Sequence, residues 1–209
     1  IAHVRGLVKT AGERLPKCSP ECFHLRAAKA MPAELAPALE PVIASIAELT
    51  VRIRHCDQLV ERLSEDKYPE TEALRAIPGV GPVTALAYVL TLEDRARFEK
   101  SRDVGPFLGL TPRRDQSGQT DKQLRITKAG NAYLRRLMVQ CANYILGRHG
   151  PDCDLRRFGL KLAERGGKNA KRRAVVAVAR KLGVLLHCLW KTGAAYEPNH
   201  RPPRAKKAA

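Results

Sequence analysis

The sequence VIASIAELTVRIRHCDQLVERL, residues 42–63, places apolar residues at alternating intervals of four and three positions. The series is Val42, Ile46, Leu49, Ile53, Cys56, Val60 and Leu63. This heptad pattern predicts one long α-helix over residues 35–68, starting near Pro37–Pro41 and ending before Pro69. The apolar seam either packs against the helix's own domain or forms a coiled coil with another helix or a second protomer.

Further helices follow on the C-terminal side. Residues 71–92 contain Ile-Pro-Gly-Val-Gly-Pro, and this glycine-rich turn between two helical patterns is typical of a helix-hairpin-helix. Gly79 and Gly81 would let the backbone approach a phosphate, although an ordinary turn between packed helices is the alternative. Apolar stripes predict two more helices over residues 128–146 and 169–190. No stretch predicts a sheet, so we expect a mostly α fold.

The charge of the chain is concentrated in its second half. The net charge is +17, and residues 105–209 hold 23 Lys and Arg against 6 Asp and Glu, which accounts for all of it. Such an asymmetry indicates a polyanionic partner, and nucleic acid is the usual one. A solubilising surface or an anionic membrane contact is the alternative. The basic tail, residues 197–209, is expected to be disordered.

A polar segment over residues 108–126 carries the chemistry that we expect. Ser117 and Gly118 lie in it among arginines and lysines, so an exposed hydroxyl could attack a phosphodiester whose charge these cations neutralise. Asp115 and Asp121 would either hold arginines or take part in metal binding, and a plain surface turn is the alternative for the Ser-Gly step. The cations expected at the phosphate are Arg113, Arg114, Lys122, Arg125 and Lys128. Further nucleic-acid contacts are expected from Arg135, Arg136, Lys171, Arg172 and Arg173.

Other functional classes are disfavoured. Cys18, Cys22 and His24 lie close together but lack the second ligand pair of a zinc site, so no metal is assigned. No apolar run approaches the roughly 20 residues of a membrane span, and no signal peptide is visible. The expected location is the bacterial cytoplasm, in association with the nucleoid.

Several motifs carry a resemblance to a known family. Gly109-Leu-Thr-Pro, the Ser-Gly step and Ile126-Thr-Lys-x-Gly-Asn-x-x-Leu-Arg-Arg resemble the C-terminal domain of the IS110 family of insertion-sequence transposases. The resemblance extends from about Val4 to Leu189. It implies DNA recombination through a serine nucleophile at Ser117, guided by a bridge RNA. It also implies a helical coiled-coil insert at the long helix, which favours a homo-oligomer.

The same resemblance implies a second catalytic half, an RNase H-like domain that binds Mg²⁺ and would precede Val4. No aspartate occurs before Asp57, so these carboxylates cannot be assigned here. We therefore expect residues 1–34 to be a remnant that follows this domain, and residues 70–196 to form the transposase domain. The expected function is a DNA transposase fragment that recombines poorly alone, and the alternative is a catalytically inactive nucleic-acid-binding module.

Overall fold

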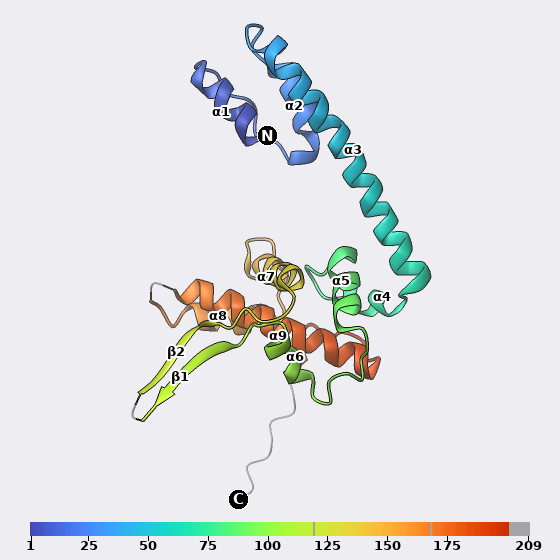
Figure 1. The fold of residues 1–209 in the computed structure, drawn as a ribbon, viewed down its shortest axis with the longest axis vertical. Coiled ribbons are helices and arrows are strands. Elements are labelled where there is room, and N and C mark those ends of the chain that lie inside the picture. The colour runs from blue at the N-terminus through green and yellow to red at the C-terminus, as the bar shows by residue number, and fades with distance from the viewer. Residues whose placement is uncertain (119, 168, 201–209) are drawn as a thin grey trace, which may run out of the picture. The chain divides into compact units, whose positions relative to one another are not determined.

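The computed structural model describes residues 1–118, 120–167 and 169–200, without the side chains of residues 120–123. The predicted fold class is confirmed, because helices account for 64% of the chain and the described sheet has two strands. The chain divides into two compact units, Ile1–Leu59 and Val60–Ala209. The longest helix crosses that boundary (Figure 1).

The first unit is a small helical cluster. It contains α1 (Ala2–Thr10), α2 (Phe23–Ala30) and the beginning of α3 (Ala36–Lys67). The Arg5 guanidinium lies 5.1 Å from the centre of the Phe23 ring and donates a hydrogen bond to the Leu15 carbonyl. The buried apolar side chains of this unit are Val4, Val8, Leu15, Phe23, Ala27, Leu39 and Ile43.

Helix α3 does not bury the seam predicted from its heptads. Leu39 and Ile43 face the core of the first unit, whereas Leu49 and Ile53 on the seam are 56% and 60% exposed. The long helix is confirmed within one residue of both expected ends. Within the described chain, its middle turns therefore present an apolar seam to solvent.

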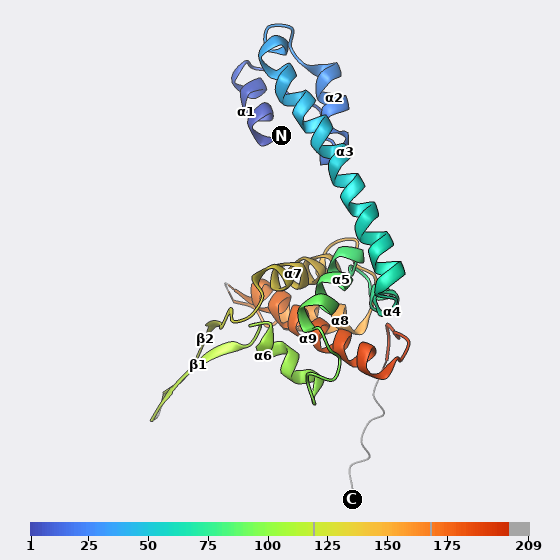
Figure 2. The same cartoon turned by 45° about the vertical axis from the view of Figure 1, so that its right-hand side comes forward.

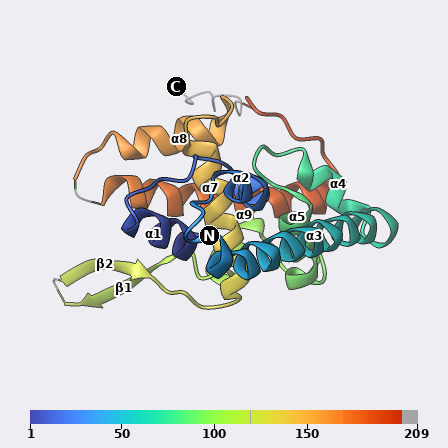
Figure 3. The same cartoon turned by 90° about the horizontal axis from the view of Figure 1, so that it is seen from above.

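The second unit is built around α9 (Ala170–Thr192), whose central turns are buried. Around it lie α4 (Glu70–Arg75), α5 (Pro82–Leu92), α6 (Val104–Phe107), α7 (Ala132–Leu146) and α8 (Asp154–Ala163). Helix α8 runs beside α9 (Figure 3). The Tyr88 hydroxyl donates a 2.6 Å hydrogen bond to the Gly183 carbonyl, which ties α5 to α9, and burial raises its pKa. The buried face of α9 includes Ala174, Val178, Leu182, Leu186 and Leu189.

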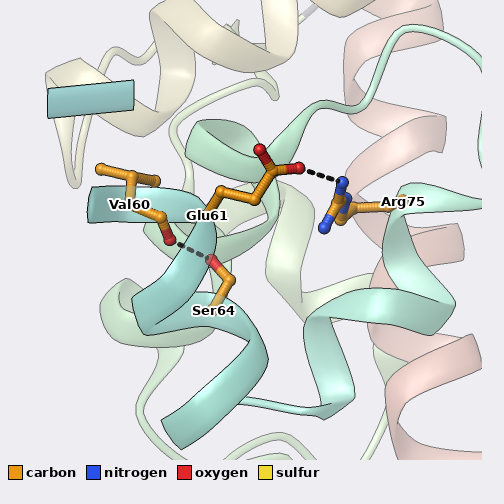
Figure 4. Close-up of polar contacts among 4 residues, drawn as sticks. All are labelled: Val60, Glu61, Ser64 and Arg75. Carbon is orange, nitrogen blue, oxygen red and sulfur yellow. Dashed lines mark hydrogen bonds and ion pairs between the residues drawn. The ribbon is translucent and has the colours of Figure 1, made fainter. Parts of the chain in front are cut away.

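The end of α3 is joined to α4 by an ion pair, and a side-chain hydrogen bond within α3 lies next to it. Arg75 forms an ion pair with Glu61 at 3.0 Å, and the Ser64 hydroxyl donates to the Val60 carbonyl at 2.8 Å (Figure 4). Both side chains of the ion pair are partly exposed, so water screens much of their attraction.

The polar segment that carries Ser117 is the main correction to the predicted fold. The prediction of a loop over residues 108–126 was wrong, because strands β1 (Pro112–Ser117) and β2 (Thr120–Ile126) pair antiparallel. We call these two strands the β-ribbon; it projects from the helices of the second unit (Figure 2). Every side chain of β1 is exposed, so the segment lacks the alternation of buried and polar residues that identifies a strand.

Helix α7 begins later than its apolar stripe predicted. The Asn131 carboxamide oxygen caps it by accepting hydrogen bonds from the amides of Tyr133 and Leu134 at 2.8 and 3.0 Å. Residues 128–130, which were expected in the first turn, instead lie at the base of the β-ribbon. Lys128 and Gly130 have positive φ angles of 59° and 72°, which are incompatible with a right-handed helix.

Candidate nucleic-acid interface

Two glycine-containing segments hold the base of the β-ribbon. We call residues 105–111 and 127–131 the glycine clasp. The Thr127 amide donates to the Thr111 carbonyl at 2.9 Å, and the Lys128 amide donates to the Gly109 carbonyl at 3.1 Å. An added Cβ would lie 2.2 Å from the Ala129 oxygen at Gly109 and 2.0 Å from the Phe107 oxygen at Gly130. Only glycine therefore lets these two backbones approach so closely.

Lys128 is the unusual member of the clasp. Its φ of 59° places a lysine in the left-handed region, where glycine carries no steric cost. Its side chain is exposed and lines the cavity described below. A strained residue of this kind is a reason to look for a function of its side chain.

Ser117 lies at the far end of the β-ribbon. It is exposed, pairs with Thr120 in the register, and precedes Gly118, whose φ is 53°. Arg113 and Arg114 lie on the same strand. The side chain of Lys122 lies outside the described residues, so its place near the serine is not described.

The other cations expected beside Ser117 lie elsewhere. The register pairs Ser117 with Thr120 at one end of the β-ribbon and Pro112 with Ile126 at the other. Five strand positions at about 3.3 Å each separate the two ends by roughly 17 Å. Arg125 and Lys128 therefore lie at the base, away from the serine, and the structure does not bring them to the same point.

The base of the β-ribbon forms one wall of an open cavity of about 1300 Å³, which we call the basic groove. Helices α8 and α9 form the other walls. Its charged lining residues are Arg125, Lys128, Arg172, Arg173, Arg180 and Lys181. Its apolar lining residues are Pro112, Leu124, Ile126, Phe158, Val176, Ala177 and Val184, and Asn169 completes the described lining. A second cavity of about 420 Å³ shares Arg125 and Lys128 and adds Arg113.

Two of the charged groove residues, Arg180 and Lys181, were not expected from the sequence. Arg180 packs its stem against Gly105, where a Cβ would lie 3.0 Å from the arginine Nε. The Lys181 ammonium lies 4.5 Å above the centre of the Phe158 ring. On α9, Arg180 lies eight positions after Arg172, and Lys181 lies eight positions after Arg173. This spacing is two intervals of four residues, which indicates that the four cations lie near one side of the helix.

Other expected contact residues have structural partners or lie apart from the groove. Arg135 donates to the carbonyls of Leu108 and Ala129 at 3.3 and 2.9 Å, so its guanidinium stabilises the glycine clasp. Arg136 is exposed and lies 5.9 Å from the centre of the Tyr133 ring. Lys171 is exposed in the first turn of α9, outside the groove lining.

The predicted helical hairpin is present as α4, a turn and α5. Gly79 has a φ of 87°, and a Cβ there would lie 2.8 Å from a ring carbon of Tyr144 on α7. The close approach at Gly79 is therefore to the protein itself. Gly81 precedes α5 and has open space around its Cα, so the first amides of α5 remain the part suited to a phosphate.

The described residues contain no group of three or more His, Cys, Asp or Glu side chains arranged to hold a metal ion. No described helix is long and apolar enough to cross a membrane. The six cysteines are free thiols.

The second unit combines an exposed β-ribbon with a groove lined by Arg and Lys side chains, an arrangement typical of proteins that bind polyanions. Comparison with known proteins gives the family of its domain. Residues 71–156 match the family described as "Transposase IS116/IS110/IS902 family". Residues 71–156 therefore carry the domain of the IS116/IS110/IS902 family of transposases.

The relatives are longer proteins. The chain is 36% identical over 121 residues to the transposase for insertion sequence element IS1111A of Coxiella burnetii, covering 57% of this chain and 32% of that protein. It is 36% identical over 91 residues to the transposase for IS1328 of Yersinia enterocolitica, covering 44% and 27%. It is 27% identical over 175 residues to a probable family 20 transposase of Pseudomonas aeruginosa, covering 80% and 51%. The chain thus spans between about a quarter and a half of these relatives.

Proposed function

We propose that this chain is the serine-bearing part of a DNA transposase that breaks and rejoins DNA by phosphoryl transfer through Ser117. Family membership supports the transposase class. The observation that carries the assignment of the serine is its exposure at the end of the β-ribbon, whose base forms the basic groove. DNA bound along the basic groove would also contact the β-ribbon, whose outer end carries the Ser117 hydroxyl.

The proposed step is an exchange of one phosphodiester for another. A bond forms between the Ser117 oxygen and phosphorus, and the bridging bond from phosphorus to the leaving nucleotide oxygen breaks. The serine proton passes to a base, and the leaving oxygen takes up a proton. Because the serine ester keeps the energy of the broken bond, attack by a new DNA hydroxyl reverses the step and rejoins the strand.

Arginines of the second unit contribute by stabilising the phosphate. Arg113 and Arg114 share β1 with the serine and are exposed. A planar guanidinium donates paired hydrogen bonds to phosphate oxygens and stays charged. Negative charge grows on the non-bridging oxygens during attack, so fixed cations stabilise that state most. Guidance of the reaction by a bridge RNA is part of the proposal and rests on the family resemblance.

Self-association through α3 is the second element of the proposal. Leu49 and Ile53 lie on a regular heptad seam and are exposed. A helix with such a seam is stabilised when the seam is buried against another helix. A second copy of the chain offers the same seam. We propose a homo-oligomer that pairs α3 helices.

The serine is tested with labelled donor and target DNA, guide RNA and magnesium, resolved on a denaturing gel. With the relatives' remaining domain supplied in trans, the chain should form a covalent protein–DNA adduct that Ser117→Ala abolishes while DNA binding is kept. Ser45→Ala, a change of another exposed serine in the first unit, is the matched control and should keep the adduct. An adduct formed by Ser117→Ala would overturn the assignment.

A binding module without strand breakage is the second candidate, because the basic groove and the charge of residues 105–209 need no serine to bind nucleic acid. In that case no adduct forms in any variant, including when the relatives' remaining domain is supplied in trans. Binding that depends on the groove arginines would persist.

A further inference from the structure

The basic groove combines two kinds of surface that a phosphate-binding site alone does not need. Its lining combines six Arg and Lys side chains, which we call the cationic rim, with carbon-rich side chains from β1, β2, α8 and α9, which we call the apolar floor. Leu124, at the wall formed by β2, is 47% exposed. A cavity lined by both cations and apolar side chains suits a ligand that is both anionic and flat or apolar.

We infer that the basic groove binds an unpaired DNA strand, with phosphates on the cationic rim and base faces on the apolar floor. The inference rests on the proposed function, because it names the form of DNA that the transposase domain holds. Paired DNA presents its phosphates and base edges outward while the base faces stay stacked inside the helix. Only an unpaired strand can turn base faces toward Leu124 and Phe158.

The floor has the features of a stacking site. The Phe158 ring is partly buried against the core, and the Lys181 ammonium lies 4.5 Å above its centre, so ring and cation are held together. Aromatic rings and apolar side chains accept any base, because each base has a π face. The cavity of about 1300 Å³ exceeds the roughly 300–1,000 Å³ of a pocket for one small ligand, so it has room for a short segment of polymer.

The lining also discriminates between possible occupants. None of its described residues carries a carboxylate, so a peptide would have to be strongly acidic and also apolar to match it. Asn169 is the only uncharged polar side chain in the described lining. Ribose needs partners for its 2′-hydroxyl, which donates and accepts hydrogen bonds, whereas deoxyribose has no such group. The carbon-rich floor therefore favours DNA over RNA.

The test compares the binding of three probes by the full chain. The probes are a fluorescent 12-nucleotide oligothymidine, the matching oligouridine and a 12-base-pair duplex, measured by anisotropy at fixed salt. Leu124→Gln makes the floor polar without changing its charge. Leu90→Gln is the matched control, because Leu90 on α5 is also 47% exposed and lies outside the groove lining. Fluorescence of the buried Trp190 and circular dichroism verify that each variant is folded.

We expect Leu124→Gln to weaken oligothymidine binding about fivefold or more and duplex binding less than twofold, since the duplex touches only the rim. Phe158→Leu should act in the same direction, and Leu90→Gln should change neither. Equal loss for both DNA probes, no loss for oligothymidine, or tighter and groove-dependent binding of oligouridine would overturn the inference. A change in oligomeric state with unchanged DNA binding would also overturn it, by making the groove a protein interface.

The inference and the proposed function fail in different ways. If oligothymidine binds but ignores Leu124, the inference fails while the covalent adduct assay on Ser117 is unaffected. If the groove binds oligothymidine as expected but no adduct ever forms, the serine mechanism fails and the groove assignment stands.

Discussion

Replacing Gly130 with alanine is expected to destabilise the second unit strongly. Gly130 has a φ of 72°, and an added Cβ would lie 2.0 Å from the Phe107 carbonyl oxygen and 3.1 Å from its carbon. Both of these atoms are backbone, so no side chain can rotate away to make space. The glycine clasp must open for the alanine to fit.

Two contributions set the size of the effect. The left-handed conformation costs alanine about 1–2 kcal/mol relative to glycine. Overpacking that displaces backbone adds about 1–3 kcal/mol, because the neighbouring clasp hydrogen bonds lengthen. We therefore expect a loss of roughly 2–5 kcal/mol in the free energy of unfolding, estimated from these two terms. For a unit of this size the loss lowers Tm by roughly 10 °C.

The assay uses the single tryptophan of the chain. Trp190 lies in the core of the second unit at 8% exposure, so its fluorescence during urea unfolding reports that unit. Gly193→Ala is the control, because Gly193 has a similar φ of 67° and no atom within 4 Å of an added Cβ. The difference between the two variants isolates the steric contribution. A difference below about 1 kcal/mol would refute the close-approach account of the clasp.

Three further predictions concern association, charge and pH. Ile53→Lys should raise the dissociation constant of the oligomer at least about tenfold in sedimentation experiments. Val51→Lys is the control and should leave that constant unchanged, because Val51 is 63% exposed and lies off the seam. Equal effects of the two variants would contradict association through the seam. Replacing Arg172 and Arg173 with glutamine should reduce the slope of log K against log salt concentration by about 1–2, where K is the association constant for duplex DNA. An unchanged slope would show that these two arginines do not contact phosphates. Burial lowers the pKa of His187 in the folded chain, so the unfolded chain binds more protons just below pH 6.5 and the free energy of unfolding should fall as the pH drops through that window. Urea unfolding midpoints at pH 7.5 and pH 5.5 measure this fall. The variant His187→Gln should show a smaller difference between the two midpoints.

Helices α7 and α9 could be predicted because each buries a stripe of its own sequence. The spacing of Val178, Leu182 and Leu186 indicates the inner face of α9, and these residues are fully buried in the structure. The same is true of Leu134 and Met138 on α7. A local period of 3.6 residues is sufficient for such elements.

The β-ribbon and the groove could not be predicted in this way. The strands of the ribbon are polar on both faces, and their only local signals are the Ser-Gly turn and the alternation of Leu124 and Ile126. The groove joins β2 to helices that begin about 30 and 45 residues later, a distance in sequence that no periodicity reports. The motifs around Gly109 and Gly130 were noticed as a resemblance, and the structure supplies their physical reason, which is backbone contact.

The separation between the base and the outer end of the β-ribbon has an evolutionary consequence. Its base is fixed by glycines and carbonyls that tolerate little change, whereas the side chains of β1 contact no core and contribute little to folding. Residues near the outer end can therefore vary at almost no thermodynamic penalty. Selection can therefore change the side chains at the outer end of the β-ribbon while the helical scaffold beneath it stays the same.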